Sequence, residues 1–222
     1  MKTPRLNFRL LTVAACCAAF TLAARADDMV RYKAKPVGSL VHIDGAANVH
    51  DWTMEGTIIG GYLEVPASVV LDSSQAALAG APDGKVKAIG EVSIPVTSLK
   101  NGKYEGMDEV MLGAMDAANF PRIQYHLATM TLKQPHAAAT PLQFDTTGEL
   151  IIKGVTNKVS FPISIETVDK GKLKITAAPI PIKMTDYGVQ PPVKYGLFIT
   201  EPGVKISFTW AVALPAKAAE PK

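Results

Sequence analysis

Alternation of apolar and polar residues with a period of two constrains the fold of this chain more than any other feature. In the segment 204–214, VKISFTWAVAL, six apolar residues fall on one face and Lys, Ser, Thr and Ala fall on the other. The segment 159–165, VSFPISI, repeats the pattern. Because successive side chains of a strand point to opposite faces, both segments predict β-strands with one buried and one solvated face.

Further strands are predicted from the same pattern, although it is weaker there. They lie at 39–44, 53–64, 65–72, 86–96, 122–133, 143–153 and 172–184. Gly-Gly, Pro-Asp-Gly, Asn-Gly and Lys-Gly steps supply turn residues between them. The intervening helices that a parallel sheet requires are missing from this pattern, so the sequence predicts an all-β antiparallel meander of eight or nine strands.

One segment has helical rather than strand periodicity. Apolar residues recur at helical spacing across 108–118, and Asp108 and Glu109 occupy the first turn, where the helix dipole favours acidic side chains. Pro121 follows and stops the helix. We therefore predict one short amphipathic α-helix that caps an end of a barrel.

The first 26 residues have the layout of a cleavable signal peptide. Lys2, Arg5 and Arg9 precede an uncharged stretch of 15 residues, and Ala-Arg-Ala at 24–26 offers a cleavage site. The stretch is shorter than the roughly 20 residues of a transmembrane helix. We expect export, a mature domain at 27–214 without a transmembrane span, and a disordered tail at 215–222.

Cleavage would change both the charge and the cysteine content. It would remove four of the 23 basic side chains and no acidic one, which leaves 19 basic against 20 acidic residues and no basic run for a nucleic acid. Cys16 and Cys17, the two cysteines, would also be lost, and with them any disulfide. Residues 13–16, VAAC, resemble a lipobox, so a lipid-anchored form through Cys16 is the alternative.

Motifs for catalysis or metal binding are missing from the sequence. It contains no Walker loop, GxGxxG, GxSxG or HExxH. The four histidines match no metal-ligand spacing, although His50 precedes Asp51. We predict no catalytic residue, no metal and no cofactor. An enzyme acting on an amphiphile is an alternative that would need His50, Asp51 and Asp108 to cluster at the barrel mouth.

Three stretches carry further information: VHIDGAANVHDW at 41–52; IPVTSLK at 94–100 with MD at 107–108 and NFPRIQY at 119–125; and GELIIKGVTNKV at 148–159. Together they resemble the YceI-like family of bacterial periplasmic proteins. The resemblance implies a periplasmic, lipocalin-like, antiparallel up-and-down β-barrel of about eight strands around a long isoprenoid chain. The chain departs from the family pattern at Ala47-Asn48 and Met107-Asp108, where many members carry His-Ser and Arg-Asp. The segment 183–192 looks like that of a divergent branch of the family.

A closed eight-stranded barrel has an interior that side chains fill or that holds one small ligand. The predicted cavity lining is Trp52, Met111, Leu112, Met115, Tyr125, Leu127, Phe161, Ile163, Ile206, Phe208 and Trp210. We predict a periplasmic carrier that sequesters an isoprenoid or quinone-like lipid. The alternative is a ligand-free structural or interaction module of the envelope with a filled barrel. A homodimer through an exposed strand edge is also compatible with the sequence.

Overall fold

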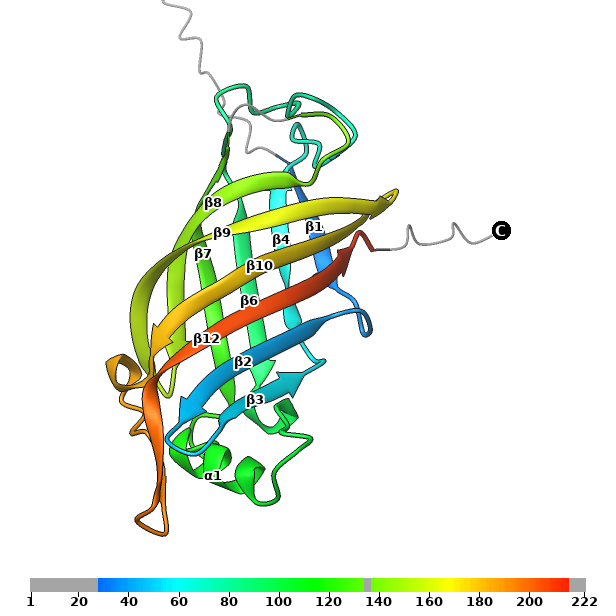
Figure 1. The fold of residues 1–222 in the computed structure, drawn as a ribbon. Helices are drawn as coiled ribbons and strands as arrows, with labels where there is room; N and C mark the ends of the chain where they lie inside the picture. The colour runs from blue at the N-terminus through cyan, green and yellow to red at the C-terminus, as the bar shows by residue number, and fades with distance from the viewer. Residues whose placement is uncertain (1–27, 134–136, 216–222) are drawn as a thin grey trace, which may run out of the picture.

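Eight antiparallel strands close into a barrel in the structure, a computed structural model that describes residues 28–133 and 137–215 (Figure 1). In their order around the barrel they are β1 (Met29–Ala34), β4 (Gly60–Pro66), β6 (Ile89–Pro95), β7 (Arg122–Leu132), β8 (Leu142–Ile152), β9 (Val155–Asp169), β10 (Lys172–Lys183) and β12 (Phe198–Ala213). Pairing of Lys33 with Ala213 and of Ala34 with Val212 closes the ring. The predicted all-β antiparallel barrel is confirmed.

The alternation of the sequence becomes alternation between the inside and the outside of the barrel. Along β8, Leu142, Phe144, Thr146 and Gly148 are buried, and the residue after each of them is exposed. The strands therefore form where the sequence places apolar side chains two residues apart.

A hairpin of two further strands widens one end of the barrel. β2 (Leu40–Ala47) pairs with β12, and β3 (Asp51–Gly56) pairs with β2. Backbone bonds in both directions between Glu55 and Lys100, at 2.8 and 2.7 Å, join β3 to the segment after β6. β9 and β10 are paired only as far as Ile163 and Ala177 toward this end. The chain is up-and-down from β6 to β12, but this hairpin separates β1 from β4 in sequence.

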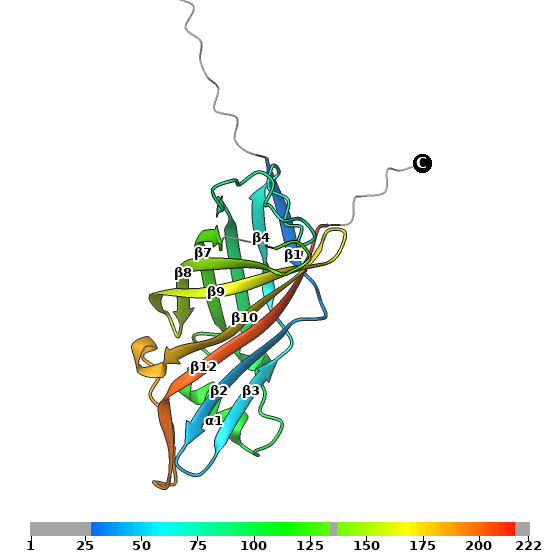
Figure 2. The same cartoon turned by 45° about the horizontal axis from the view of Figure 1, so that its top comes forward.

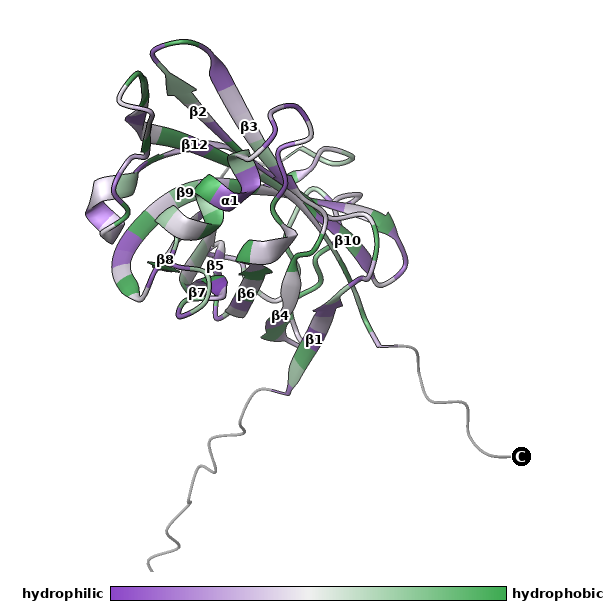
Figure 3. Ribbon diagram, turned by 90° about the horizontal axis from the view of Figure 1, so that it is seen from below, coloured by the Kyte–Doolittle hydropathy of each residue, from purple (hydrophilic) through white to green (hydrophobic). Residues whose placement is uncertain are grey.

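The helix α1 (Met107–Ala114) lies across this widened end, as Figure 3 shows from below. It confirms the predicted capping helix, although it is shorter than 108–118 because a turn with Asp116 at φ 49° follows it. Short 3-10 turns, η1 (Val96–Ser98) and η2 (Met184–Tyr187), flank the same end. The two-residue strands β5 (Lys85–Val86) and β11 (Val193–Lys194) pair with β7 and β12.

The opposite end of the barrel is filled. Val69, Leu71, Leu78 and Ala81 of the connection 67–84 are buried in the same core as Phe144. The predicted strand at 65–72 is therefore wrong beyond Pro66. Val69 and Leu71 are buried against the barrel end, but the backbone bonds of the segment close turns, such as Val69 N to Pro66 O at 2.8 Å, instead of pairing with a strand.

The strands differ from the predictions at two other places, near 53–64 and at β1. The segment 53–64 divides into β3 and β4 around residues 57–59, and buried Ile59 continues the apolar pattern through this connection. β1 was not predicted because it is short, although Arg31 and Lys33 alternate there with the less exposed Val30, Tyr32 and Ala34. The predicted leader at 1–26 and all but the first residue of the predicted tail lie outside the described residues. Within the described part, no helix is long and apolar enough to cross a membrane.

Candidate ligand-binding cavity

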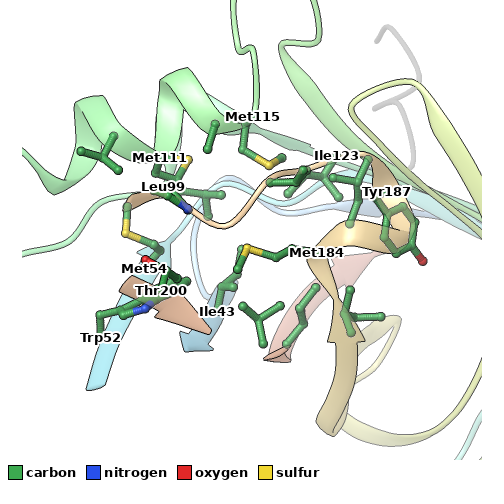
Figure 4. A pocket seen from close by; sticks show the side chains of 18 of the residues that line it. Ile43, Trp52, Met54, Leu99, Met111, Met115, Ile123, Met184, Tyr187 and Thr200 are labelled. Carbon is green, nitrogen blue, oxygen red and sulfur yellow. The ribbon is translucent and has the colours of Figure 1, made fainter. Parts of the chain in front are cut away.

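An apolar outer chamber lies beneath α1 (Figure 4). The empty space in and around it amounts to about 830 Å³, which includes open solvent. Its lining residues are Ile43, Trp52, Met54, Leu99, Met107, Val110, Met111, Ala114, Met115, Ile123, Ile152, Ile182, Met184, Tyr187, Val189, Pro192, Thr200, Val204 and Ile206.

An inner chamber lies farther into the barrel, and the empty space in and around it amounts to about 730 Å³, which includes open solvent. It is lined by Val41, Ile43, Ile59, Val92, Ile94, Leu99, Ile123, Gln124, Tyr125, Leu150, Val159, Phe161, Ile180, Ile182, Ile206, Phe208 and Trp210. Five residues, among them Ile43 and Ile206, line both chambers, so the two chambers adjoin. No charged side chain of the described residues lines either chamber.

The helix closes the outer chamber with one apolar face. Met107, Val110, Met111 and Ala114 are three or four residues apart, so they lie on the same side of α1. Met54, Met111, Met115 and Met184 gather around the chamber in Figure 4. Methionine is flexible and unbranched, so this part of the wall can repack around chains of different shape.

The N-terminal end of α1 is held by Asn101. Its backbone N–H donates to Asp108 Oδ1 at 2.7 Å, and its side-chain Nδ2 donates to Thr53 O of β3 at 2.8 Å. The bond from the Asn101 N–H, with a further contribution from Lys100, lowers the pKa of Asp108. Lys100 Nζ lies 3.2 Å from Asp108 Oδ2. The start of the helix is thereby tied to the β2–β3 hairpin.

The C-terminal end of α1 is held by the β8–β9 turn. Lys153 Nζ donates to Ala114 O at 3.1 Å and to Gly188 O at 3.3 Å. A lysine suits this position because the last carbonyls of a helix have no partners within it. The stretch 148–159, which resembles the YceI-like family, therefore positions the helix and the turn after η2.

Two glycines make room for aromatic side chains of the cavity wall. A Cβ atom at Gly45 would overlap the Trp52 ring, and one at Gly148 would overlap the Tyr125 ring. Tyr125 lies 5.3 Å from Phe161 between ring centroids, and Phe161 lies 6.3 Å from Phe208, edge to face. An aromatic cluster therefore forms part of the wall of the inner chamber.

Three polar atoms of the cavity wall are buried without a hydrogen-bond partner: Trp52 Nε1, Tyr125 Oη and Trp210 Nε1. The neighbouring Thr146 hydroxyl donates to Phe161 O at 2.6 Å. Burial raises the pKa of Tyr125 against a smaller, lowering contribution from Thr146, which keeps the Tyr125 hydroxyl protonated. Buried polar atoms therefore interrupt a wall that is otherwise largely apolar.

Most of the side chains predicted to line the cavity lie in it. The outer chamber contains Trp52, Met111 and Met115, the inner one contains Tyr125, Phe161, Phe208 and Trp210, and Ile206 faces both. Leu112, Leu127 and Ile163 do not line either chamber. They pack in or against the hydrophobic core.

Sequence reasoning missed most of each wall, 15 of the 19 lining residues of the outer chamber and 12 of the 17 of the inner chamber. For Ile43, Ile182 and Val204 the signal was present, because each lies two residues from another lining residue on its strand. For Met184, Tyr187 and Val189 it was absent, because they lie on or just after η2.

The enzyme alternative needs His50, Asp51 and Asp108 to cluster at the mouth of the barrel, and these residues do not line one hollow there. Asp108 is engaged by Asn101 and Lys100, and the His50 ring stacks on Tyr104 with 4.0 Å between centroids. Of His50, Asp51 and Asp108, only His50 lines the hollow at the mouth of the cavity. Across residues 28–133 and 137–215 there is no group of three potential metal ligands.

Comparison with known proteins assigns the family. A model of the YceI-like domain matches residues 32–213. The chain belongs to the YceI-like family. No curated protein matches its sequence.

Two solved structures share the YceI-like fold of this chain. A polyisoprenoid binding domain from Saccharophagus degradans, implicated in plant cell wall breakdown, superposes with a TM-score of 0.59 at 13% identity over 84% of this chain and 99% of that one. Burkholderia cenocepacia BcnA gives a TM-score of 0.55 at 19% identity over 79% and 98%. At these identities the likeness shows the fold alone.

Proposed function

We propose that this protein is an exported carrier that sequesters a long apolar ligand, an isoprenoid or quinone-like lipid, inside its barrel. The observation that carries the proposal is the pair of adjoining chambers without a charged lining residue in the half of the barrel next to α1. Each CH₂ group buried in such a cavity contributes about 0.8 kcal/mol, so an apolar chain binds with little polar chemistry.

The sequence and the family support this function and its location. The S. degradans relative is described as a polyisoprenoid binding domain. The signal-like layout of residues 1–26 supports export to the periplasm, with residues 27–214 as the mature domain. Anchoring through Cys16 is the alternative form of the same protein.

The unpartnered donors favour a ligand that carries an oxygen atom. A buried donor without a partner costs about 1–3 kcal/mol. A carbonyl or hydroxyl oxygen that accepts from Tyr125 Oη or Trp210 Nε1 in the inner chamber would offset this cost. We therefore favour a quinone or a polyprenol over a plain hydrocarbon.

The test is native mass spectrometry of protein exported from a bacterial host, followed by organic extraction and by uptake of an added isoprenoid quinone. Ile206→Trp fills the junction of the two chambers and should abolish uptake. Ile89→Trp is the matched control because Ile89 is exposed and lines neither chamber.

A discrete apolar adduct that is lost only in Ile206→Trp would support the carrier. A bare protein that takes up no quinone would overturn it and favour the ligand-free interaction module. The intact mass also reports cleavage after Ala26, lipid at Cys16 and any homodimer.

A further inference from the structure

The β11–β12 hairpin, residues 193–199, exposes an unusual number of large apolar side chains. Five of the fourteen exposed large hydrophobic residues of the described chain lie in these seven positions: Val193, Tyr195, Leu197, Phe198 and Ile199. Tyr195 is 79% exposed and Leu197 is 70% exposed. The hairpin projects beyond the barrel in Figure 1 and Figure 2. A cluster of this kind on a soluble surface marks an interaction site.

Polar contacts hold the hairpin in this position. Asn48, in the turn between β2 and β3, donates from Nδ2 to Leu197 O at 2.9 Å and accepts at Oδ1 from Ile199 N at 2.9 Å. The backbone N–H of Asn48 also donates to Ile199 O at 3.0 Å. The backbone is therefore fixed while the apolar side chains point into solvent.

The apolar surface of the hairpin is continuous with the cavity. Tyr195, Phe198 and exposed Val49 line a hollow at the mouth. This hollow shares Met107 and Thr200, among others, with the outer chamber. A water-insoluble ligand that moves along this path meets mainly apolar side chains, with His50 and Glu105 also lining the hollow.

We propose that the β11–β12 hairpin, together with Val49, docks on a lipid bilayer and places the cavity mouth at the membrane surface. The inference rests on the proposed function, since a lipid ligand resides in a bilayer before it is carried. An apolar hairpin that projects from the surface can enter a bilayer, because a bilayer needs no complementary pocket to receive it. Tyrosine favours the membrane–water interface. The mature chain, with 19 basic against 20 acidic residues, offers no general attraction to anionic lipid, so docking should depend little on salt.

Flotation with vesicles of phosphatidylethanolamine and phosphatidylglycerol tests the proposal, using exported protein whose intact mass shows cleavage after Ala26. Leu197→Asp should lower the vesicle-bound fraction about tenfold or more, because a leucine that would enter the bilayer is replaced by a charge. Val168→Asp is the matched control, since Val168 is also exposed (62%) but lies near the β9–β10 turn at the other end of the barrel.

Uptake of an isoprenoid quinone is measured twice, from ethanol and from vesicles. Leu197→Asp should slow uptake from vesicles and leave uptake from ethanol unchanged. Equal vesicle binding by wild type and Leu197→Asp, or none by wild type, would overturn docking, as would a hairpin that captures only a protein partner. Hairpin-dependent vesicle binding without quinone uptake from ethanol would uphold docking and overturn the carrier.

Discussion

Trp52, Tyr125 and Trp210 are unusual among the aromatic residues because each buries a polar atom without a partner in the cavity wall. A residue that served packing alone would be better replaced by phenylalanine, which removes the unpaired group. Retaining these donors is useful if a ligand supplies the acceptor. Gly45 and Gly148 support this interpretation, because they leave room for two of the three rings.

Tyr125→Phe should therefore have opposite effects on stability and on binding. Without ligand, the free energy of unfolding should rise by about 1 kcal/mol because the unpaired hydroxyl is removed. The affinity for an isoprenoid quinone should fall about tenfold because its oxygen loses a donor. Urea unfolding and quinone titration measure the two quantities.

Tyr62→Phe is the control, since Tyr62 lies beside Arg31 and lines neither chamber. It should leave the quinone affinity unchanged. If Tyr125→Phe binds quinone as wild type does, Tyr125 does not contact the ligand.

At the scale of elements, α1 is a cover that polar contacts hold at both ends. Asn101 and Asp108 fix its start, and Lys153 fixes its end to the β8–β9 turn. None of its residues is fully buried. These contacts, rather than burial alone, keep the cover in place over the outer chamber.

Asp108→Asn should reduce stability in a pH-dependent way. A carboxyl whose pKa is lowered by folding stabilises the protein above its ordinary pKa of 3.8, and this contribution is lost as the pH falls through the lower folded-state value. The variant should lose up to about 1 kcal/mol at pH 7, since the site is partly exposed. In urea unfolding, the difference from wild type should shrink below pH 3.8.

Glu109→Gln provides the comparison, because Glu109 occupies the same first turn and is exposed. It should have little effect at either pH. A loss in Asp108→Asn that persists unchanged in acid would contradict the role of the charge.

At the scale of the molecule, one barrel contains both a filled half and a hollow half. The connection 67–84 fills the end that holds Phe144, and the β2–β3 hairpin widens the end that α1 covers. The interior of a small barrel is either filled by side chains or able to hold a ligand. Both kinds of interior occur here along the same strands.

Truncating an aromatic residue in each half should reveal this difference. Phe144→Ala should cost about 3–5 kcal/mol, because Phe144 is fully enclosed and its removal leaves a cavity. Phe208→Ala should cost less, about 1–2 kcal/mol, because its ring already faces the inner chamber and has fewer contacts to lose. Urea unfolding without ligand compares them, and equal losses would contradict the hollow half.

Local patterns predicted much of this architecture. Alternation identified most barrel strands and the inward positions of Phe161, Ile206 and Phe208. It failed at 65–72, where the same alternation belongs mostly to the connection that fills the barrel end and has no partner strand. It also could not separate Leu127 and Ile163 from the residues that line the cavity. Both errors concern the part of the fold that a side chain faces. The neighbouring residues in the sequence carry no information about it.

The sequence by itself determined that this chain forms an antiparallel barrel with a capping helix, because side-chain direction in strands and helices repeats at short, fixed intervals. Only the tertiary structure decided where the barrel is hollow and where it opens. That depends on contacts between residues far apart in the chain, such as Asn48 with Leu197, Lys153 with Ala114 and Glu55 with Lys100. Such contacts form through the folded geometry and have no periodic signature in the sequence.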